Sequence, residues 1–154
     1  MRRALIMMAL GVMLAGCGGG GVRERVFPPT VSVQELALQS NGDWALKLRL
    51  QNFSNVSMRV DAVDAQLRVA GQDAGPISLQ PGVSVPPESA EVVAFTLAPG
   101  ATAAAEVTQA IAAGRGVRYA VQGTIRSSEP RSRRDDFTFE SQLSVVPGLP
   151  GVLR

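Results

Sequence analysis

The sequence predicts an all-β protein, a two-sheet antiparallel sandwich of about seven strands with one short helix. In several stretches apolar and polar residues alternate with a period of two, which is typical of half-buried strands. Clusters of glycine, proline and asparagine separate these stretches, as expected of turns. One alanine-rich segment breaks the alternation and predicts the helix.

The clearest predicted strand covers residues 44–51. Its apolar side chains share one face and its basic and amide side chains share the other: Trp44, Leu46, Leu48 and Leu50 against Lys47, Arg49 and Gln51. The same alternation predicts strands within residues 93–97, 117–126 and 137–145.

Two further predicted strands change phase partway along. Val31 and Val33 share one parity, whereas Leu36 and Leu38 share the other, and a similar change occurs within residues 58–69. A one-residue slip would turn every later side chain onto the wrong face, so each change predicts a bulge or a bend. In a sandwich, such a bend can carry a long strand from one sheet to the other.

The alanine-rich segment predicts a helix over residues 103–113. Val107 and Ile111 lie four positions apart and would share one helical face. Thr102 is the expected N-terminal cap, and Gly114 is expected to end the helix.

The first residues have the layout of an export signal. Arg2 and Arg3 form a positive start, and residues 4–15 are an uncharged, mostly apolar run. The alternative is a transmembrane helix, which needs about 20 apolar residues to cross the hydrocarbon core. This run has about a dozen before the glycines, so a cleaved signal peptide is expected.

The stretch Leu14-Ala15-Gly16-Cys17 resembles a bacterial lipobox. In that motif the cysteine is lipidated and the chain is cut before it, here between Gly16 and Cys17. The alternative is an ordinary signal peptide with an incidental thiol. Cys17 is the only cysteine, so it has no partner for a disulfide within the chain. Gly18 follows it in place of aspartate, which by the usual bacterial sorting rule indicates the periplasmic face of the outer membrane.

These features divide the chain into four parts. We expect a signal peptide at residues 1–16, a lipidated cysteine and flexible Gly/Pro tether at 17–29, the sandwich domain at 30–147 and a C-terminal tail at 148–154. Cleavage removes two arginines, so the 15 basic residues fall to 13 and equal the 13 acidic ones. This balance gives no reason to expect a nucleic-acid partner.

The order of the predicted elements resembles a known family, the WHy (water stress and hypersensitive response) domain of the late embryogenesis abundant type 2 proteins, which includes bacterial lipoproteins. The matching features are the amphipathic strand at 44–51, Gly71, the motif Tyr119-Ala120-Val121-Gln122-Gly123, and the later Phe137 and Phe139. The sequence departs from the family at Asn52-Phe53-Ser54-Asn55, where the family has Asn-Pro-Asn. The resemblance implies an immunoglobulin/fibronectin-III-like sandwich and a non-enzymatic role associated with stress or desiccation.

The residues offer little for catalysis. Histidine is absent from the sequence, which removes Ser-His and Cys-His nucleophile pairs and the commonest metal ligand. The carboxylate pairs Asp61/Asp64 and Asp135/Asp136 are expected to be solvated acids in turns and at strand edges. We therefore expect no enzyme and no cofactor, apart from the covalent lipid on Cys17.

A cluster of arginines is the candidate contact surface. Arg131, Arg133 and Arg134 fall in an expected hairpin loop between the last two strands. They would contact anionic lipid headgroups or an acidic partner. We favour the alternative, a solvated loop in which neighbouring carboxylates partly neutralise them, because no aromatic residue lies among the arginines.

The leading functional hypothesis is a non-catalytic domain, anchored by lipid in the bacterial cell envelope, that binds or protects other molecules there. Its partners would be the membrane, through the lipid anchor, and an envelope protein. The alternatives are an accessory lipoprotein that docks on an envelope assembly, and an enzyme or a carrier of a small apolar ligand.

Overall fold

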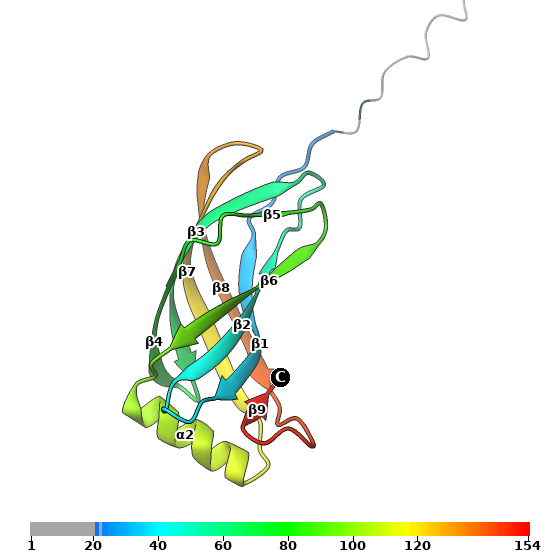
Figure 1. The fold of residues 1–154 in the computed structure, drawn as a ribbon. Coiled ribbons are helices and arrows are strands. Elements are labelled where there is room, and N and C mark those ends of the chain that lie inside the picture. Colours follow the sequence, from blue (N-terminus) through cyan, green and yellow to red (C-terminus); the bar gives the residue numbers. More distant parts are fainter. Residues whose placement is uncertain (1–20, 22) are drawn as a thin grey trace, which may run out of the picture.

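The computed structural model describes residue 21 and residues 23–154 and confirms the all-β sandwich (Figure 1). One sheet has four strands in the order β6 (Ala90–Leu97), β2 (Trp44–Gln51), β1 (Thr30–Leu38) and β9 (Val152–Leu153). The other has five, with β4 (Gln72–Leu79), β3 (Met58–Val69), β7 (Val117–Glu129) and β8 (Arg133–Leu143) side by side. Its fifth strand, β5 (Val83–Val85), pairs with the start of β3. All of these pairs are antiparallel.

The predicted alternation fills the space between the sheets. The apolar side chains of β2, namely Trp44, Leu46, Leu48 and Leu50, are at most 1% exposed, while Lys47 and Arg49 are exposed on the outer face. Each such side chain contributes about 1.5–3 kcal/mol when it is fully buried. The apolar side chains that recur at every second residue of the sequence therefore form the core.

Both predicted phase changes are bulges. In β1 the pairing with β2 shifts between Val33 and Glu35, so Val33 and Leu36 both point inward although they are three residues apart. In β3 the pairing with β7 shifts twice between Arg59 and Ala62. Each strand nevertheless stays within its own sheet, so the bulges correct the facing of the side chains and do not carry a strand across.

Gly123 is required by the closeness of two strands. It lies opposite Ala65 of β3, and an added Cβ would sit 2.2 Å from the Asp64 carbonyl oxygen and 2.4 Å from the Ala65 Cα. Any side chain would push β7 away from β3. This explains the glycine that ends the motif Tyr119-Ala120-Val121-Gln122-Gly123.

The helix α2 (Ala101–Ala112) starts two residues earlier than predicted. Its N-cap is Gly100, which makes no side-chain cap, and Thr102 lies inside the helix. The backbone N–H of Gly100 donates to the Ala74 carbonyl oxygen, and a Cβ at Gly100 would sit 2.7 Å from the carbonyl oxygen of Asp73. The chain therefore enters the helix where close contact with β4 admits only glycine.

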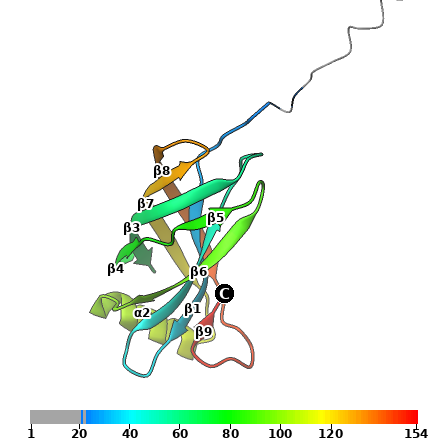
Figure 2. The same cartoon turned by 45° about the horizontal axis from the view of Figure 1, so that its top comes forward.

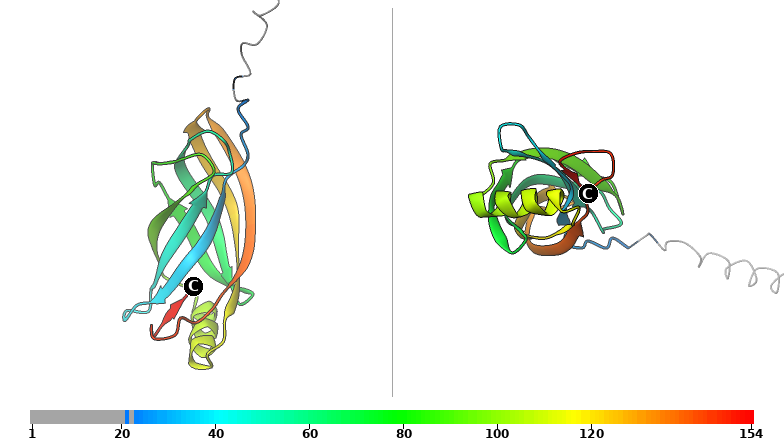
Figure 3. Two further views of the ribbon diagram at one scale, coloured as in Figure 1. Left: turned by 90° about the vertical axis from the view of Figure 1, so that its right-hand side faces the viewer. Right: turned by 90° about the horizontal axis from the view of Figure 1, so that it is seen from below.

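The C-terminal end of α2 follows the prediction. Gly114 has a φ of +64°, its N–H donates to the Ile111 carbonyl oxygen, and the N–H of Arg115 donates to that of Ala110. This pair of bonds is a Schellman motif, which ends a helix at a left-handed residue. The helix buries Ala103, Val107 and Ala110 and lies across one end of the sandwich (Figure 3).

The last residues are part of the sandwich, whereas a separate tail was expected at 148–154. Val152 and Leu153 form β9, which pairs with Leu36 and Ala37 of β1, and the Leu153 side chain is fully buried. The backbone of Arg154 also bonds to that of Ser144 in both directions, at 2.5 and 2.9 Å. A two-residue strand is too short to show a period, which is why the alternation does not reveal it.

The two ends of the sandwich differ. Figures 1 and 2 show the first described residues, the β2–β3 and β5–β6 loops and the β7–β8 hairpin gathered at one end. We call this the entry end and define it as residues 23–27, 52–57, 86–89 and 126–134. The opposite helix end comprises α2, its flanking loops and the turns at residues 39–43, 70–71 and 144–151.

Candidate functional site

The predicted lipidation and cleavage residues, Cys17 and Gly16, lie outside the described residues. Their roles stay predictions. The chain is described continuously from Arg23, only six positions after Cys17.

The entry segment, residues 23–27, is bound to the β2–β3 loop. The N–H of Arg25 donates to Asn55 Oδ1 at 2.6 Å, and Asn55 Nδ2 donates to the Arg23 carbonyl oxygen at 3.0 Å. The Asn55 N–H in turn donates to the Arg25 carbonyl oxygen, and the Phe27 N–H donates to Ser54 Oγ at 2.9 Å. Part of the expected flexible tether is therefore fixed to the domain.

Asn52 holds together the loops beneath this segment. Its Nδ2 lies 2.9, 3.1 and 3.0 Å from the carbonyl oxygens of Val56, Val85 and Pro86, and its Oδ1 accepts the Ser54 N–H at 2.9 Å. The Asn52 side chain is 1% exposed. One asparagine thus joins the β2–β3 loop to the end of β5. The motif at which the sequence departs from the WHy family is the polar centre of the entry end.

The three predicted contact arginines do not act together. Arg131 is exposed in the turn of the hairpin, and Arg134 is exposed with its Nη2 3.1 Å from Thr124 Oγ1. Arg133 points to the inner side, where its Nη2 lies 2.5 Å from Asp135 Oδ1. Its charge is therefore matched within the protein, and only Arg131 and Arg134 of the three face outward.

Asp135 is not the solvated acid that was expected. It is 9% exposed because it shares the inner parity of β8 with Phe137 and Leu143. Asp135 Oδ2 and Ser127 Oγ are buried and have no hydrogen-bond partner among the described residues. A shallow hollow of about 410 Å³ lies beside them at the hairpin, lined by Asp61, Arg126, Ser127, Ser132, Arg133 and Arg134.

The other predicted carboxylates have partners elsewhere or face solvent, although Asp61 also lines the hollow at the hairpin. Asp61 Oδ1 lies 3.4 Å from Arg59 Nε, and Asp64 Oδ1 accepts a bond from Ser78 Oγ at 2.8 Å. Asp136 is exposed on the outer face of β8. Within residues 21 and 23–154 no three His, Cys, Asp or Glu side chains gather as a metal site. No helix in this part of the chain is long and apolar enough to cross a membrane.

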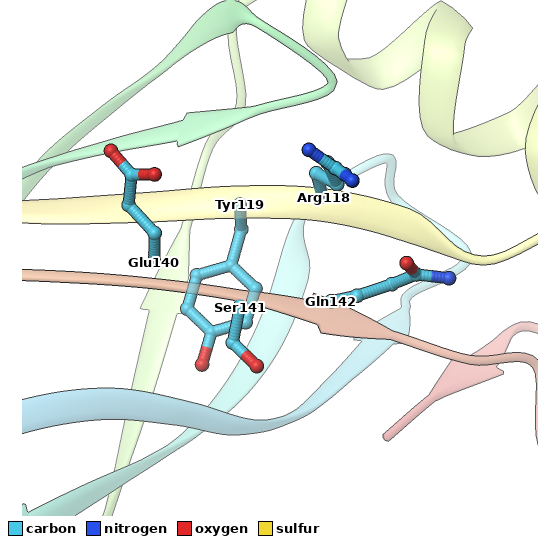
Figure 4. A pocket seen from close by; sticks show the side chains of 5 residues that line it. All are labelled: Arg118, Tyr119, Glu140, Ser141 and Gln142. Atoms are coloured by element: carbon cyan, nitrogen blue, oxygen red, sulfur yellow. The ribbon is translucent and has the colours of Figure 1, made fainter.

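A second hollow of about 340 Å³ lies beside Tyr119 (Figure 4). Figure 4 shows Tyr119 and Ser141 on one side of β7 and β8, with Arg118 and Glu140 on the other. The Tyr119 hydroxyl accepts the Val33 N–H and donates to the Val33 carbonyl oxygen, both at 3.1 Å. Burial raises the pKa of Tyr119, so the phenol is the neutral form that this pair of bonds requires. Tyr119 thus joins β7 to the bulge of β1, across the two sheets.

A charged network fixes the C-terminus on the outer face of the four-stranded sheet. Glu35, the residue after the bulge, lies 2.9 Å from Lys47 Nζ and 2.6 Å from Arg154 Nη2. Hydrogen bonds from Lys47 and then Arg154 hold the pKa of Glu35 below its ordinary value. Sequence reasoning had not singled out Glu35 or Arg154, and it had named Asn52 only as part of the departure from the WHy motif, because the partners of these residues lie far away along the chain.

Comparison with known proteins supports the fold. A solution structure of AT1g01470 from Arabidopsis thaliana matches with a TM-score of 0.56 at 12% identity, over 84% of this chain and 89% of that one. A solution structure of At2g46140.1, described as a putative late embryogenesis abundant (LEA) protein, matches with a TM-score of 0.48 at 11% identity, over 94% and 86%. No protein family and no curated protein matches the sequence. The similarity to AT1g01470 shows a shared fold at very low identity.

Proposed function

We propose that the protein is a non-catalytic, lipid-anchored domain of the bacterial cell envelope, of the late embryogenesis abundant type 2 (WHy) kind. It is held through Cys17, at the periplasmic face of the outer membrane, and protects or binds other molecules there during water stress. The stress role rests on the resemblance to the WHy domain, both in the sequence features around Tyr119–Gly123 and in the sandwich fold that the chain forms.

The observation that carries the proposal is how the polar side chains are used. Asn52, Ser54 and Asn55 hold loops and the entry segment, Tyr119 joins the sheets and Glu35 fixes the C-terminus. Each is engaged with the protein's own backbone or with a matched charge. Such groups stabilise a fold, and catalysis would instead need a positioned acid, base or nucleophile that faces a substrate.

The entry segment supports the anchored arrangement. Six residue steps separate Cys17 from Arg23, which span about 20 Å when fully extended. Because residues 23–27 are bound to the β2–β3 loop, a lipid on Cys17 would keep the entry end within that distance of the membrane surface. The helix end would face away from it.

The carrier alternative receives less support. A carrier of an apolar ligand needs an apolar cavity, whereas the space between these sheets is filled by core side chains such as Trp44, Leu48 and Leu67, each at most 1% exposed. The hollows at Tyr119 and at the hairpin lie outside this core and are lined largely by polar residues.

A genetic rescue experiment tests the proposal. A strain that lacks the gene should lose viability or envelope integrity on drying, and the wild-type gene should restore both. Cys17→Ser should fail to rescue although the domain folds, because the anchor is lost. The exposed-acid variants Asp64→Asn and Asp136→Asn should rescue fully. Loss of rescue in either acid variant, with folding and anchoring intact, would contradict the non-catalytic assignment. Full rescue by Cys17→Ser would contradict the need for an anchor.

A further inference from the structure

We propose that the entry end is itself a membrane-contact surface, which seats the domain against anionic phospholipid in addition to the lipid on Cys17. This inference rests on the proposed function, which places the domain next to a membrane. Two independent features of the entry end support it: a pair of exposed aromatic side chains and an excess of exposed arginines.

The aromatic pair consists of Phe27 and Phe53, which are 48% and 50% exposed. Both residues belong to one hydrogen-bonded unit, because the Phe27 N–H donates to Ser54 Oγ and Phe53 immediately precedes Ser54. Single exposed apolar residues are normal, but two large ones in one hydrogen-bonded unit, next to the segment that leads to Cys17, indicate a contact surface. Aromatic rings backed by polar groups are suited to the headgroup region of a bilayer.

The charge of the entry end has the matching sign. Leaving out Arg133, whose charge is matched by Asp135, its exposed arginines outnumber its acids by five to three: Arg23, Arg25, Arg126, Arg131 and Arg134 against Glu24, Glu88 and Glu129. The loops and helix of the helix end carry one arginine, Arg115, against Asp43 and Glu106. A domain with this polarity turns its entry end toward an anionic surface.

Not every arginine can take part. Arg133 is bound by Asp135, so we assign the lipid contacts to Arg126, Arg131 and Arg134. Arg126 and Arg134 are directly opposite each other in the β7–β8 pairing, where two like charges repel. A lipid phosphate between them would relieve that repulsion and accept bonds from both guanidinium groups.

The experiment uses the chain that begins at Gly18, which carries no lipid. Residues 23–154 hold both sheets, the helix and the whole buried core, so this chain keeps the fold. Its binding to vesicles of phosphatidylglycerol and phosphatidylethanolamine is compared with binding to phosphatidylcholine vesicles by flotation. Each arginine near an anionic surface contributes about fivefold to partitioning, so an excess of two predicts a preference of about 25-fold.

Matched variants separate this surface from the rest of the molecule. Arg131→Gln should weaken binding to anionic vesicles about fivefold, whereas Arg115→Gln at the helix end should leave it unchanged. Phe53→Ser should also weaken binding, whereas Leu149→Ser, a similarly exposed residue (44%) at the helix end, should not. Unfolding curves of all four variants serve as the control for the fold.

Three results would overturn the proposal. The first is a preference for anionic vesicles below tenfold. The second is equal loss of binding in the entry-end and helix-end variants. The third is sensitivity to Arg131→Gln without sensitivity to Phe53→Ser, which would show attraction by charge alone, with no seating of the aromatic side chains in the bilayer. Because this chain lacks Cys17, none of these results depends on whether Cys17 is lipidated, and failure of the anchor is seen separately by detergent partitioning of the full-length product.

Discussion

Replacing Asn52 with alanine is the most direct test of how the entry end is held together. The side chain makes close approaches to three carbonyl oxygens and accepts the Ser54 N–H, all within a region that water hardly reaches. Asn52→Ala removes these bonds and leaves their partners on Val56, Val85 and Pro86 without a donor. We expect the entry end to loosen and the whole domain to lose stability.

The size of the loss follows from the bonds. An amide NH₂ has two hydrogens, so the three carbonyl contacts count as about two full hydrogen bonds, and the Ser54 N–H adds a third. At about 1 kcal/mol for each bond, with a further cost for buried groups left unpaired, the substitution should destabilise the fold by about 3–5 kcal/mol. Typical domains are stable by only about 5–15 kcal/mol, so the effect is large.

Urea unfolding followed by tryptophan fluorescence measures this loss. Trp44 is the only tryptophan and is 1% exposed, so its emission reports the core. A slope of about 1–3 kcal/mol per molar urea turns the expected loss into a midpoint shift of at least about 1 M. Asn55→Ala is the control, because the Asn55 side chain bonds only the entry segment and the loss of its two exposed bonds should cost about 1–2 kcal/mol. A loss below 1 kcal/mol for Asn52→Ala, or equal losses for the two variants, would refute the reasoning.

Four further perturbations are expected to behave as follows. Tyr119→Phe should destabilise by about 1–3 kcal/mol, because both polar groups of Val33 lose their partner, with the loss read from the urea midpoint. Leu48→Ala should cost about 2–5 kcal/mol in the same measurement, since that side chain is fully buried. The pKa of Glu35 is lowered in the folded state, so its stabilisation is present above its ordinary value of 4.5 and is lost as pH falls through the folded value. Glu35→Gln should therefore be less stable than wild type at pH 7 and converge with it in acid; a constant difference across pH would contradict this. Cys17→Ser should leave an unprocessed precursor, and wild-type protein that stays in the aqueous phase during detergent partitioning would contradict lipidation.

The parts of the fold that were predictable share one physical cause. In β2 and β7 each residue's facing is set by its immediate neighbours, because successive side chains of a strand point to opposite faces. The break in that rule at Val33 and Leu36 was visible for the same reason, and it correctly located a bulge. Local rules written into neighbouring residues can be read from the sequence alone.

Strands β5 and β9 were not predicted, because they have three and two residues, too few for a period to appear.

The burial of Asp135 was not predicted for a different reason. Its parity matches Phe137 and Leu143 and placed it on the inner face, but acids are seldom buried and the expectation followed the residue type. Parity was the better guide here, because Arg133 lies two positions earlier on the same face and matches the charge.

The entry end shows the limit of local rules most clearly. Asn52 contacts Val85 and Pro86, which are 33 and 34 positions away, and Asn55 contacts Arg23, which is 32 positions away. Nothing near Asn52 in the sequence distinguishes it from a solvated turn residue. An apolar side chain is buried by any suitable neighbour, whereas a buried amide needs particular donors and acceptors in particular places. The residues that hold the entry end, and with it the surface proposed to meet the membrane, could therefore be recognised only after the fold had brought those distant partners together.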